Sequence, residues 1–138
     1  MYKTCTYCKK KKLRSKFRNR NNVCKTCEKY KKRQILYEAK LKVIDHYGGK
    51  CICCGTSELS FLTLDHINGD GYIHRRNFNR SLKLYQDLIN NKFQTQFKIQ
   101  ILCANCHNSK SKFGRCIHSM TPQETAIWLY GEHYVKVV

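Results

Sequence analysis

Apolar residues predict a long helix in the N-terminal third of the chain. Residues 28–47 contain neither Gly nor Pro, and their large aliphatic residues follow the mixed three- and four-residue spacing of one helical face. These residues are Ile35, Leu36, Leu41 and Ile44. The pair Gly48-Gly49 follows directly and predicts the end of an amphipathic helix.

The middle of the chain combines a strand pattern with helical patterns. Residues 61–67 are rich in strand-forming side chains and lead into the turn dipeptides Asn68-Gly69 and Asp70-Gly71. We therefore expect a hairpin strand that enters a loop. Residues 77–91 have helical apolar spacing, and another helix is expected to begin near residue 104.

The C-terminal segment carries a helix-start signal. Thr121 and Glu124 match a capping box, with Pro122 at the first helical position. A helix is therefore predicted through Trp128 and Tyr130, in which we expect Trp128 to make a core or dimer contact.

Charge divides the chain into two unequal parts. The 138 residues include 27 Lys and Arg against 9 Asp and Glu, a formal net charge of +18, and residues 1–50 hold 17 of the basic residues but only 3 of the acids. Cations placed along a polyphosphate backbone gain counterion-release free energy, so nucleic acid is the leading partner class. The asymmetry predicts a basic binding module, residues 1–48, and a nearly neutral second module, residues 49–138.

Ten cysteines in so short a chain predict metal sites or disulfides. The sequence begins without the apolar segment of a secretory signal, and no run approaches the roughly 18 apolar residues of a membrane span. We therefore expect an intracellular protein, of the cytoplasm or nucleoid, with no membrane partner. In that reducing setting, closely spaced cysteines favour zinc thiolates over disulfides.

Two cysteine pairs in the basic module predict a structural zinc site. Cys5-x-x-Cys8 and Cys24-x-x-Cys27 are separated by 15 residues, and four thiolates complete a closed tetrahedral shell. The residues between the pairs are mostly Lys and Arg and cannot bury enough surface to fold alone. Zinc is therefore expected to supply most of their ordering free energy, about 10 kcal/mol.

A second set of four cysteines spans the second module. Pairing the two groups predicts another structural zinc site that ties the beginning of the module to its end. Its expected ligands are Cys51, Cys54, Cys103 and Cys106. Cys53 could replace Cys51 only with poorer geometry, so Cys53 and Cys116 are interpreted as spare thiols that behave as small buried apolar residues.

Candidate chemistry lies between these cysteine pairs. Asp65 and His66 are consecutive, so on a regular strand their side chains would point to opposite faces, and a bend or bulge would be needed to bring them into one cavity. His107 lies at the edge of the zinc-bound face of its predicted helix; the alternative is that it replaces a cysteine as a zinc ligand. A carboxylate, an imidazole ligand and an imidazole base around a divalent ion suit hydrolysis of a phosphodiester.

Two strings of residues carry a family resemblance. Residues 64–71, Leu-Asp-His-Ile-Asn-Gly-Asp-Gly, are followed by His74-Arg75 and by residues 102–110, Leu-Cys-Ala-Asn-Cys-His-Asn-Ser-Lys. Together they resemble the HNH endonucleases of the ββα-metal superfamily over roughly residues 48–113. The resemblance implies a small, zinc-stabilised α+β fold with a ββα-metal core, preceded here by the basic zinc knuckle and its helix.

The same resemblance implies the roles of the candidate residues. His66 would be the general base that activates water, while Asp65 and His107 would hold a divalent metal, usually magnesium, against the scissile phosphate and the leaving 3′ oxygen. The structural zinc would take no part in the chemistry.

The chain departs from the family pattern at Lys98, where members often have an asparagine that orients the base histidine. Asn68, Asn105 or a backbone carbonyl could hold His66 instead. Members with a Gly-rich loop after Asp-His also lack that asparagine and keep a pair like His74-Arg75. For His74 this implies contact with the phosphate or assistance to the metal; the alternative is a solvated loop histidine.

The expected function is metal-dependent HNH cleavage of double-stranded DNA, with two structural Zn²⁺ ions and one catalytic divalent cation, Mg²⁺. The expected DNA contacts are Lys29, Lys32, Arg33, Arg75, Arg76 and Lys110, although the helical lysines could equally form a solvated face. One alternative is a non-catalytic zinc-finger protein that binds DNA or RNA; another is a thiol redox protein, which predicts no bound zinc. Apolar residues from Trp128 to Val138 would support a homodimer.

Overall fold

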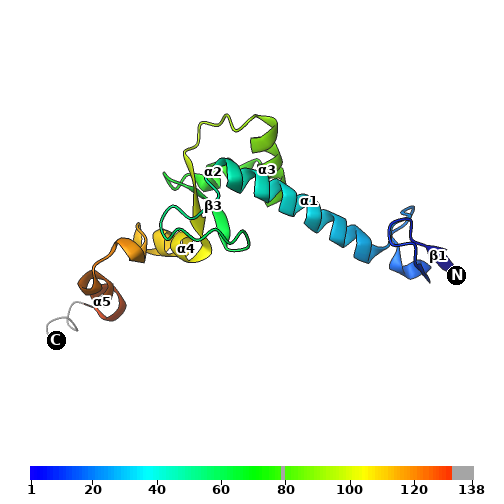
Figure 1. Cartoon of the computed structure of the whole chain (residues 1–138), viewed down its shortest axis with the longest axis horizontal. Coiled ribbons are helices and arrows are strands. Elements are labelled where there is room, and N and C mark those ends of the chain that lie inside the picture. The colour runs from blue at the N-terminus through cyan, green and yellow to red at the C-terminus, as the bar shows by residue number, and fades with distance from the viewer. Residues whose placement is uncertain (79, 132–138) are drawn as a thin grey trace. The chain divides into compact units, whose positions relative to one another are not determined.

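The computed structural model describes residues 1–78 and 80–131, and these form a small α+β protein. They contain five α-helices and two antiparallel sheets of two strands each (Figure 1). The chain is divided into two compact units, Met1–Lys40 and a second unit that begins at Leu41. The coarse prediction of a small α+β protein is confirmed.

The first unit is built around cysteines. Strands β1 (Tyr2–Thr4) and β2 (Lys11–Leu13) pair antiparallel and are followed by the 3₁₀ turn η1 (Arg14–Lys16). The buried cluster of this unit is Cys5, Phe17, Cys24 and Cys27. Because Phe17 is the only large apolar side chain in that cluster, the unit has little hydrophobic burial to stabilise it.

Helix α1 (Lys25–His46) confirms the predicted helix and extends it at its N-terminus. Gly48 and Gly49 follow with φ of 102° and 69°, a left-handed conformation that side chains with a Cβ rarely adopt, so the helix stops there. Of the predicted apolar face, Ile44 is buried as expected, but Ile35, Leu36 and Leu41 are exposed. The buried residues of the helix are Cys27 near its start and Ala39, Val43 and Ile44 near its end.

The end of α1 explains why the unit boundary lies before the predicted one near Gly48-Gly49. Ile44 packs in the buried cluster of the second unit with Leu62 and Ile101. The last turns of α1 therefore belong to that unit's core, and the boundary between units falls within the helix, after Lys40. The glycine pair ends a helix and does not separate two domains.

The second unit centres on a two-stranded sheet with a helix beside it. Strands β3 (Leu62–His66) and β4 (Ile99–Cys103) pair antiparallel, with Leu62 opposite Cys103 and His66 opposite Ile99. Helix α4 (Ala104–Phe113) follows β4 directly and lies beside β3 (Figure 1). The predicted strand and the predicted helix near residue 104 are both confirmed.

In the segment between the strands one expectation is wrong and another is confirmed with a later start. The segment after Gly69 is the short helix α2 (Gly71–Arg76), with Asp70 at its N-cap, and is not a loop. The helix predicted for residues 77–91 is α3 (Ser81–Asn90), which begins later because Asn77 ends α2. The short helix buries His74 on its inner side, a contact that turn propensity in the sequence does not report.

The C-terminal segment contains the 3₁₀ turn η2 (Ile117–Ser119) and helix α5 (Pro122–Tyr130). The predicted capping box is confirmed, because the Thr121 side chain accepts from the Glu124 backbone N–H while Glu124 accepts from the Thr121 N–H. That N–H, together with the nearby Arg115, lowers the pKa of Glu124 to about 2.

The aromatic end of α5 is partly exposed. Trp128 contacts Phe113 edge to face, with ring centroids 3.8 Å apart, and is half exposed. Residues 132–138 of the predicted dimer surface lie outside the described residues. None of the described helices has the length and apolar character that crossing a bilayer requires.

Candidate active site and metal centres

The first cysteine set brings its four sulfurs together. The Sγ atoms of Cys5, Cys8, Cys24 and Cys27 all lie within 4.8 Å of one another. The Lys12 ammonium lies 3.3 Å from the Cys24 sulfur, a contact that raises the pKa of Lys12. The Cys24 backbone N–H also donates to the Cys5 sulfur at 3.3 Å. These donors favour thiolates, and four of them could hold zinc in a closed shell.

The second cysteine set also converges. Cys51, Cys54, Cys103 and Cys106 place their sulfurs within 4.8 Å of one another. The Cys54 and Cys103 sulfurs are 3.7 Å apart. Zinc–sulfur bonds of about 2.3 Å at tetrahedral angles place neighbouring sulfurs about 3.8 Å apart, whereas a disulfide needs about 2.05 Å. The set is therefore suited to zinc, as predicted.

The second set joins a loop to the beginning of α4. Cys103 is the N-cap of that helix, and its sulfur accepts the Cys106 backbone N–H at 3.4 Å. The loop is held against β4 by a backbone bond from Ile52 N–H to the Ile101 carbonyl, 3.0 Å long. Zinc at this position would thus fix α4 relative to the sheet.

The burial expected of Cys53 is wrong, whereas Cys116 packs against the core cluster of the second unit. Cys53 is exposed and Cys116 is half-buried, and both lie in a third group of donors with Cys106 and His118. His118 was not predicted as a ligand from the sequence, although its position two residues after Cys116 is a short metal-ligand spacing. His107 belongs to none of the three cysteine groups among the described residues, so its alternative role as a substitute zinc ligand is wrong.

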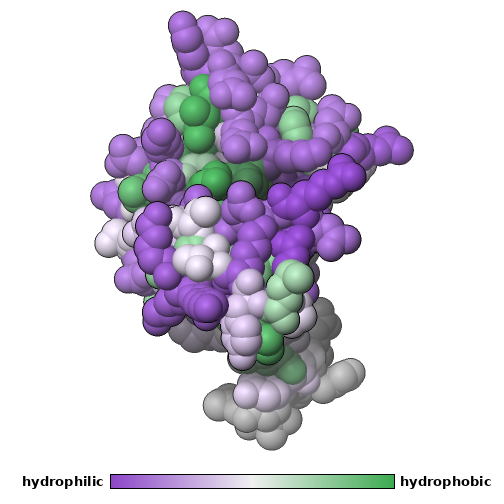
Figure 2. Space-filling view, turned by 90° about the vertical axis from the view of Figure 1, so that its right-hand side faces the viewer, coloured by the Kyte–Doolittle hydropathy of each residue, from purple (hydrophilic) through white to green (hydrophobic). Residues whose placement is uncertain are grey.

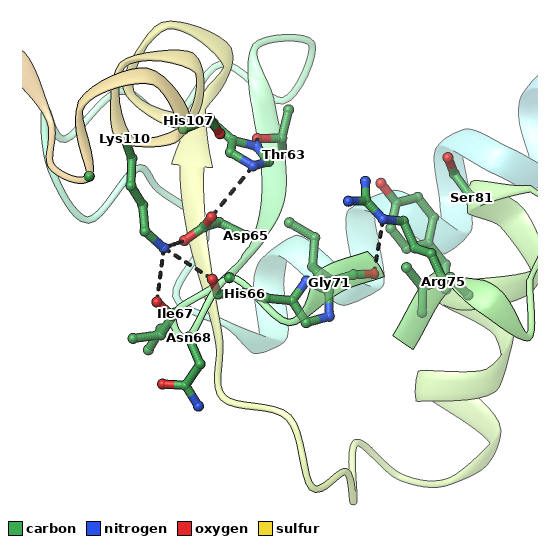
Figure 3. A pocket seen from close by; sticks show the side chains of 16 residues that line it. Thr63, Asp65, His66, Ile67, Asn68, Gly71, Arg75, Ser81, His107 and Lys110 are labelled. Atoms are coloured by element: carbon green, nitrogen blue, oxygen red, sulfur yellow. Dashed lines mark hydrogen bonds and ion pairs between the residues drawn. The ribbon is translucent and has the colours of Figure 1, made fainter. Parts of the chain in front are cut away.

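A cavity of about 700 Å³ opens beside the sheet in the second unit (Figure 3). It is lined by residues of β3, α2, α3 and α4, so segments far apart in the sequence share it. The candidate residues on its wall are Asp65, His66, Gly71, Arg75, His107 and Lys110.

Asp65 connects β3 to α4 on one side of this cavity. Asp65 as a residue is 4% exposed, and its Oδ2 atom accepts from the Lys110 ammonium and from the Gln100 amide, each at 2.6 Å. Lys110 also donates to the backbone carbonyls of His66 at 3.0 Å and Ile67 at 3.2 Å. The predicted role of Lys110 as a DNA contact is not supported, because its ammonium is engaged inside the site.

His107 faces the other oxygen of the same carboxylate. Its Nε2 lies 3.4 Å from Asp65 Oδ1, and its Nδ1 lies 3.0 Å from the Thr63 hydroxyl. That hydroxyl donates its own hydrogen to the Leu102 carbonyl at 2.9 Å, so it accepts from His107 Nδ1–H. In neutral His107 the Nε2 lone pair then faces a carboxylate oxygen. Two acceptors at this distance require a proton or a cation between them.

His66 points away from Asp65 (Figure 3). Strand β3 pairs regularly through both residues, with Asp65 opposite Gln100 and His66 opposite Ile99, so the bend or bulge considered from the sequence is absent. The two side chains therefore alternate as strand residues do. Both nevertheless line the same cavity, because it extends past the end of the strand.

His66 is paired with His74. The His66 Nε2 and His74 Nδ1 atoms are 2.8 Å apart, and the two side chains belong to residues that are 7% and 5% exposed. Phe97 stacks on the His74 ring with centroids 4.2 Å apart. The alternative of a solvated loop histidine is therefore wrong for His74. Among the described residues, Lys98, Asn68 and Asn105 make no side-chain hydrogen bond to His66.

Both imidazoles are biased toward the neutral form. Burial lowers the pKa of His66, and the charges of His74 and Arg75 lower it further. Burial also lowers the pKa of His74. Asp70 opposes both shifts, and its Oδ1 atom is buried without a hydrogen-bond partner among the described residues. One imidazole can therefore donate to the other near neutral pH.

Gly71 leaves room for the His66 ring. A Cβ at this position would lie 2.7 Å from His66 Nδ1 and 3.1 Å from its Cγ. A Cβ atom does not lie within 3.0 Å of a non-bonded heavy atom unless something moves, so the position of the ring requires glycine at residue 71.

The remaining predicted DNA contacts lie on exposed surface. Lys29, Lys32 and Arg33 are exposed on α1, where Lys32 also lies 3.8 Å from Glu28. Arg75 and Arg76 are exposed on α2, and the Arg75 Nε–H donates to the Gly71 carbonyl at 3.1 Å. Figure 2 shows one face of the molecule, on which hydrophilic residues predominate and apolar ones are scattered.

Comparisons of the chain with known proteins identified no related protein. No family model, no curated protein and no solved structure matches the chain significantly.

Proposed function

We propose that this chain is a metal-dependent endonuclease of the HNH type that hydrolyses phosphodiester bonds in double-stranded DNA. The observation that carries the proposal is that Asp65 Oδ1 and His107 Nε2 face one another 3.4 Å apart on the wall of an open cavity. A divalent cation would satisfy both atoms at once. The resemblance noted in the sequence assigns the same two residues to the metal.

The donor set suits magnesium. Mg²⁺ is commonly held by one or two protein ligands and keeps several waters, which substrate phosphate oxygens can replace. Asp65 and His107 would hold the ion, and the Thr63 hydroxyl would fix the ring of His107 by accepting from its Nδ1–H. When bound, such an ion supplies charge stabilisation at the scissile phosphate.

His66 would act as the general base. If its Nε2–H donates to His74 Nδ1, the lone pair lies on Nδ1, beside Gly71 and the cavity. The lowered pKa of His66 keeps this nitrogen unprotonated near neutral pH, so it can accept a proton from water. His74 would then be a positioning residue, which performs for His66 the role that the family usually gives to an asparagine.

The basic first unit and α2 would bind the substrate. Arg75 lines the cavity and is exposed, so its guanidinium is available to a phosphate near the site. Residues 1–50 hold 17 of the 27 basic residues. Their charge would set affinity and its dependence on salt.

Plasmid nicking tests the proposal. Purified full-length protein is incubated with supercoiled plasmid and Mg²⁺, with and without excess EDTA. We expect conversion to open-circular or linear DNA that depends on the metal. His66→Ala should reduce the rate about 10²–10⁴-fold, the usual contribution of a general base, and Asp65→Asn should lower the apparent affinity for Mg²⁺.

Matched variants separate chemistry from folding. His46→Ala and Asp45→Asn change the same residue types at exposed positions on α1 and should cut as the wild type does. Zinc content and circular dichroism are measured for each variant. If His66→Ala cuts as fast as wild type while retaining its zinc, the assignment of the base is wrong.

A second candidate function is non-catalytic zinc-dependent binding of DNA or RNA. Two contacts favour it: Lys110 with Asp65, and His74 with His66. Contacts of both kinds also occur where ion pairs and buried histidines serve only to stabilise a fold. It predicts tight, salt-dependent binding without cleavage under any divalent metal. A gel-shift assay run beside the nicking assay distinguishes the two functions.

A further inference from the structure

We propose that the second unit holds a pair of zinc ions that share the Cys106 thiolate, and not one zinc ion alone. The second ion would be bound by Cys53, Cys106, Cys116 and His118. Together with the site in the first unit, this gives three zinc ions per chain.

The contacts of His118 carry this inference. Its Nδ1 atom lies 3.5 Å from the Cys53 sulfur, 3.4 Å from the Cys106 sulfur and 3.4 Å from the Cys116 sulfur. A single ring nitrogen has one hydrogen or one lone pair, so it cannot make three linear hydrogen bonds in three directions. The three sulfurs lie at nearly equal distances from the nitrogen. Together the four atoms can occupy the four corners of a tetrahedral coordination site, with the metal ion between them.

The distances agree with tetrahedral zinc. Zinc–sulfur bonds of about 2.3 Å and zinc–nitrogen bonds of about 2.05 Å give sulfur–nitrogen edges of about 3.6 Å at tetrahedral angles. The three observed separations are within 0.2 Å of that value. All four donor atoms lie within 4.8 Å of one another.

Cys106 belongs to both groups of donors in the second unit. It lies with Cys51, Cys54 and Cys103 in one group and with Cys53, Cys116 and His118 in the other. A thiolate sulfur has more than one lone pair and can bridge two metal ions. The first group is complete only with Cys106, and the same is true of the second. A shared sulfur satisfies both without leaving an ion three-coordinate.

Local structure holds the second group in place without the metal. The backbone N–H of Ile117 donates to the Ser109 hydroxyl at 2.7 Å, which fastens the start of η2 to α4. Within the turn, the Ser119 hydroxyl donates to the Cys116 carbonyl at 2.6 Å. Cys53 lies in the loop between Cys51 and Cys54. The ion would therefore tie three separate segments together: that loop, α4 and η2.

Metal stoichiometry on the full chain tests the inference. The protein is purified in reductant, and zinc is measured by inductively coupled plasma mass spectrometry against protein concentration from amino-acid analysis. We expect three zinc ions per chain in the wild type and two in Cys116→Ser and in His118→Ala. His46→Ala removes an exposed histidine outside every cysteine group and should keep three.

Cadmium tests the shared sulfur directly. In protein loaded with ¹¹³Cd, two ions joined by one thiolate show scalar coupling between their NMR signals, while the ion of the first unit shows none. We expect one coupled pair, and His118→Ala should abolish the coupling while leaving two signals. Because His118 is exposed, His118→Ala removes a ligand without emptying the core.

Three results would overturn the inference. Two zinc ions per chain in the wild type, unchanged by His118→Ala, would show that the second group binds no metal. Three ions without cadmium coupling would show that Cys106 is not shared. A disulfide between Cys53 and Cys116, found by alkylation and mass spectrometry in protein that holds two zinc ions, would assign these thiols to redox chemistry.

Discussion

Replacing Gly71 with alanine tests the position of the His66 ring. The new Cβ would lie 2.7 Å from Nδ1, 3.1 Å from Cγ and 3.3 Å from Cε1 of that ring. The ring is held from the other side by His74 at 2.8 Å and by an edge contact with Phe97. It therefore cannot move aside without breaking at least one of these contacts.

The expected magnitude follows from two opposing terms. Overpacking a filled site costs about 1–3 kcal/mol. Gly71 is the first residue of α2, and alanine is favoured over glycine within helices by up to about 1 kcal/mol. Gly71→Ala should therefore destabilise the second unit by about 1–2 kcal/mol. Displacement of the ring should also slow plasmid nicking by at least about 10-fold, since small misplacements of a catalytic group are costly.

A double-mutant cycle isolates the clash. The free energy of unfolding is measured by urea titration with circular dichroism, at saturating zinc, for wild type, Gly71→Ala, His66→Ala and the double variant. In the His66→Ala background there is no ring to collide with, so Gly71→Ala should be neutral or slightly stabilising. The interaction free energy should thus be about 1–3 kcal/mol. An equal penalty for Gly71→Ala in both backgrounds would refute the assigned ring position.

Three further predictions address the base, the buried carboxylate and the first unit. Burial and the charge of His74 lower the pKa of His66. The kcat/KM for nicking at fixed Mg²⁺ should therefore rise with pH and reach half its maximum below pH 6.5, the ordinary pKa of histidine. A midpoint above 6.5 contradicts the assignment of His66 as the general base. Lys110→Met leaves the Asp65 carboxylate without its ammonium partner. It should lower the free energy of unfolding of the second unit, measured by urea titration, by about 2 kcal/mol. Lys112→Met, at an exposed position of the same helix, should change that free energy by less than about 0.5 kcal/mol. Chelation of zinc should remove amide-exchange protection from residues 1–24 and re-addition should restore it; protection that survives with no metal bound would show that the unit folds without zinc.

Local features of the chain were predictable from sequence. The two cysteine sets that could hold zinc follow from repeated Cys-x-x-Cys spacing, because such a turn points two sulfurs at one position whatever surrounds it. The capping box of α5 and the glycine stop of α1 are also local, since each depends on backbone groups within a few residues.

Features that depend on long-range packing were not predictable in the same way. The sequence placed Asp65 and His66 side by side but could not tell which neighbours each would find. Pairing of β3 with β4 decided that Asp65 meets His107 and Lys110, more than 40 residues away. The helix α2, predicted as a loop, decided that His74 reaches His66.

The cysteines show the same division. Spacing alone identified two sets of four cysteines that could hold zinc, and it left Cys53 and Cys116 as spare thiols. Only the fold brings those two beside Cys106 and His118, because a 3₁₀ turn after α4 returns the chain to the loop that contains Cys53. Sequence thus determined which residues can bind metal through short-range geometry. The tertiary structure decided which of them meet, because contacts between distant segments depend on strand register and helix packing.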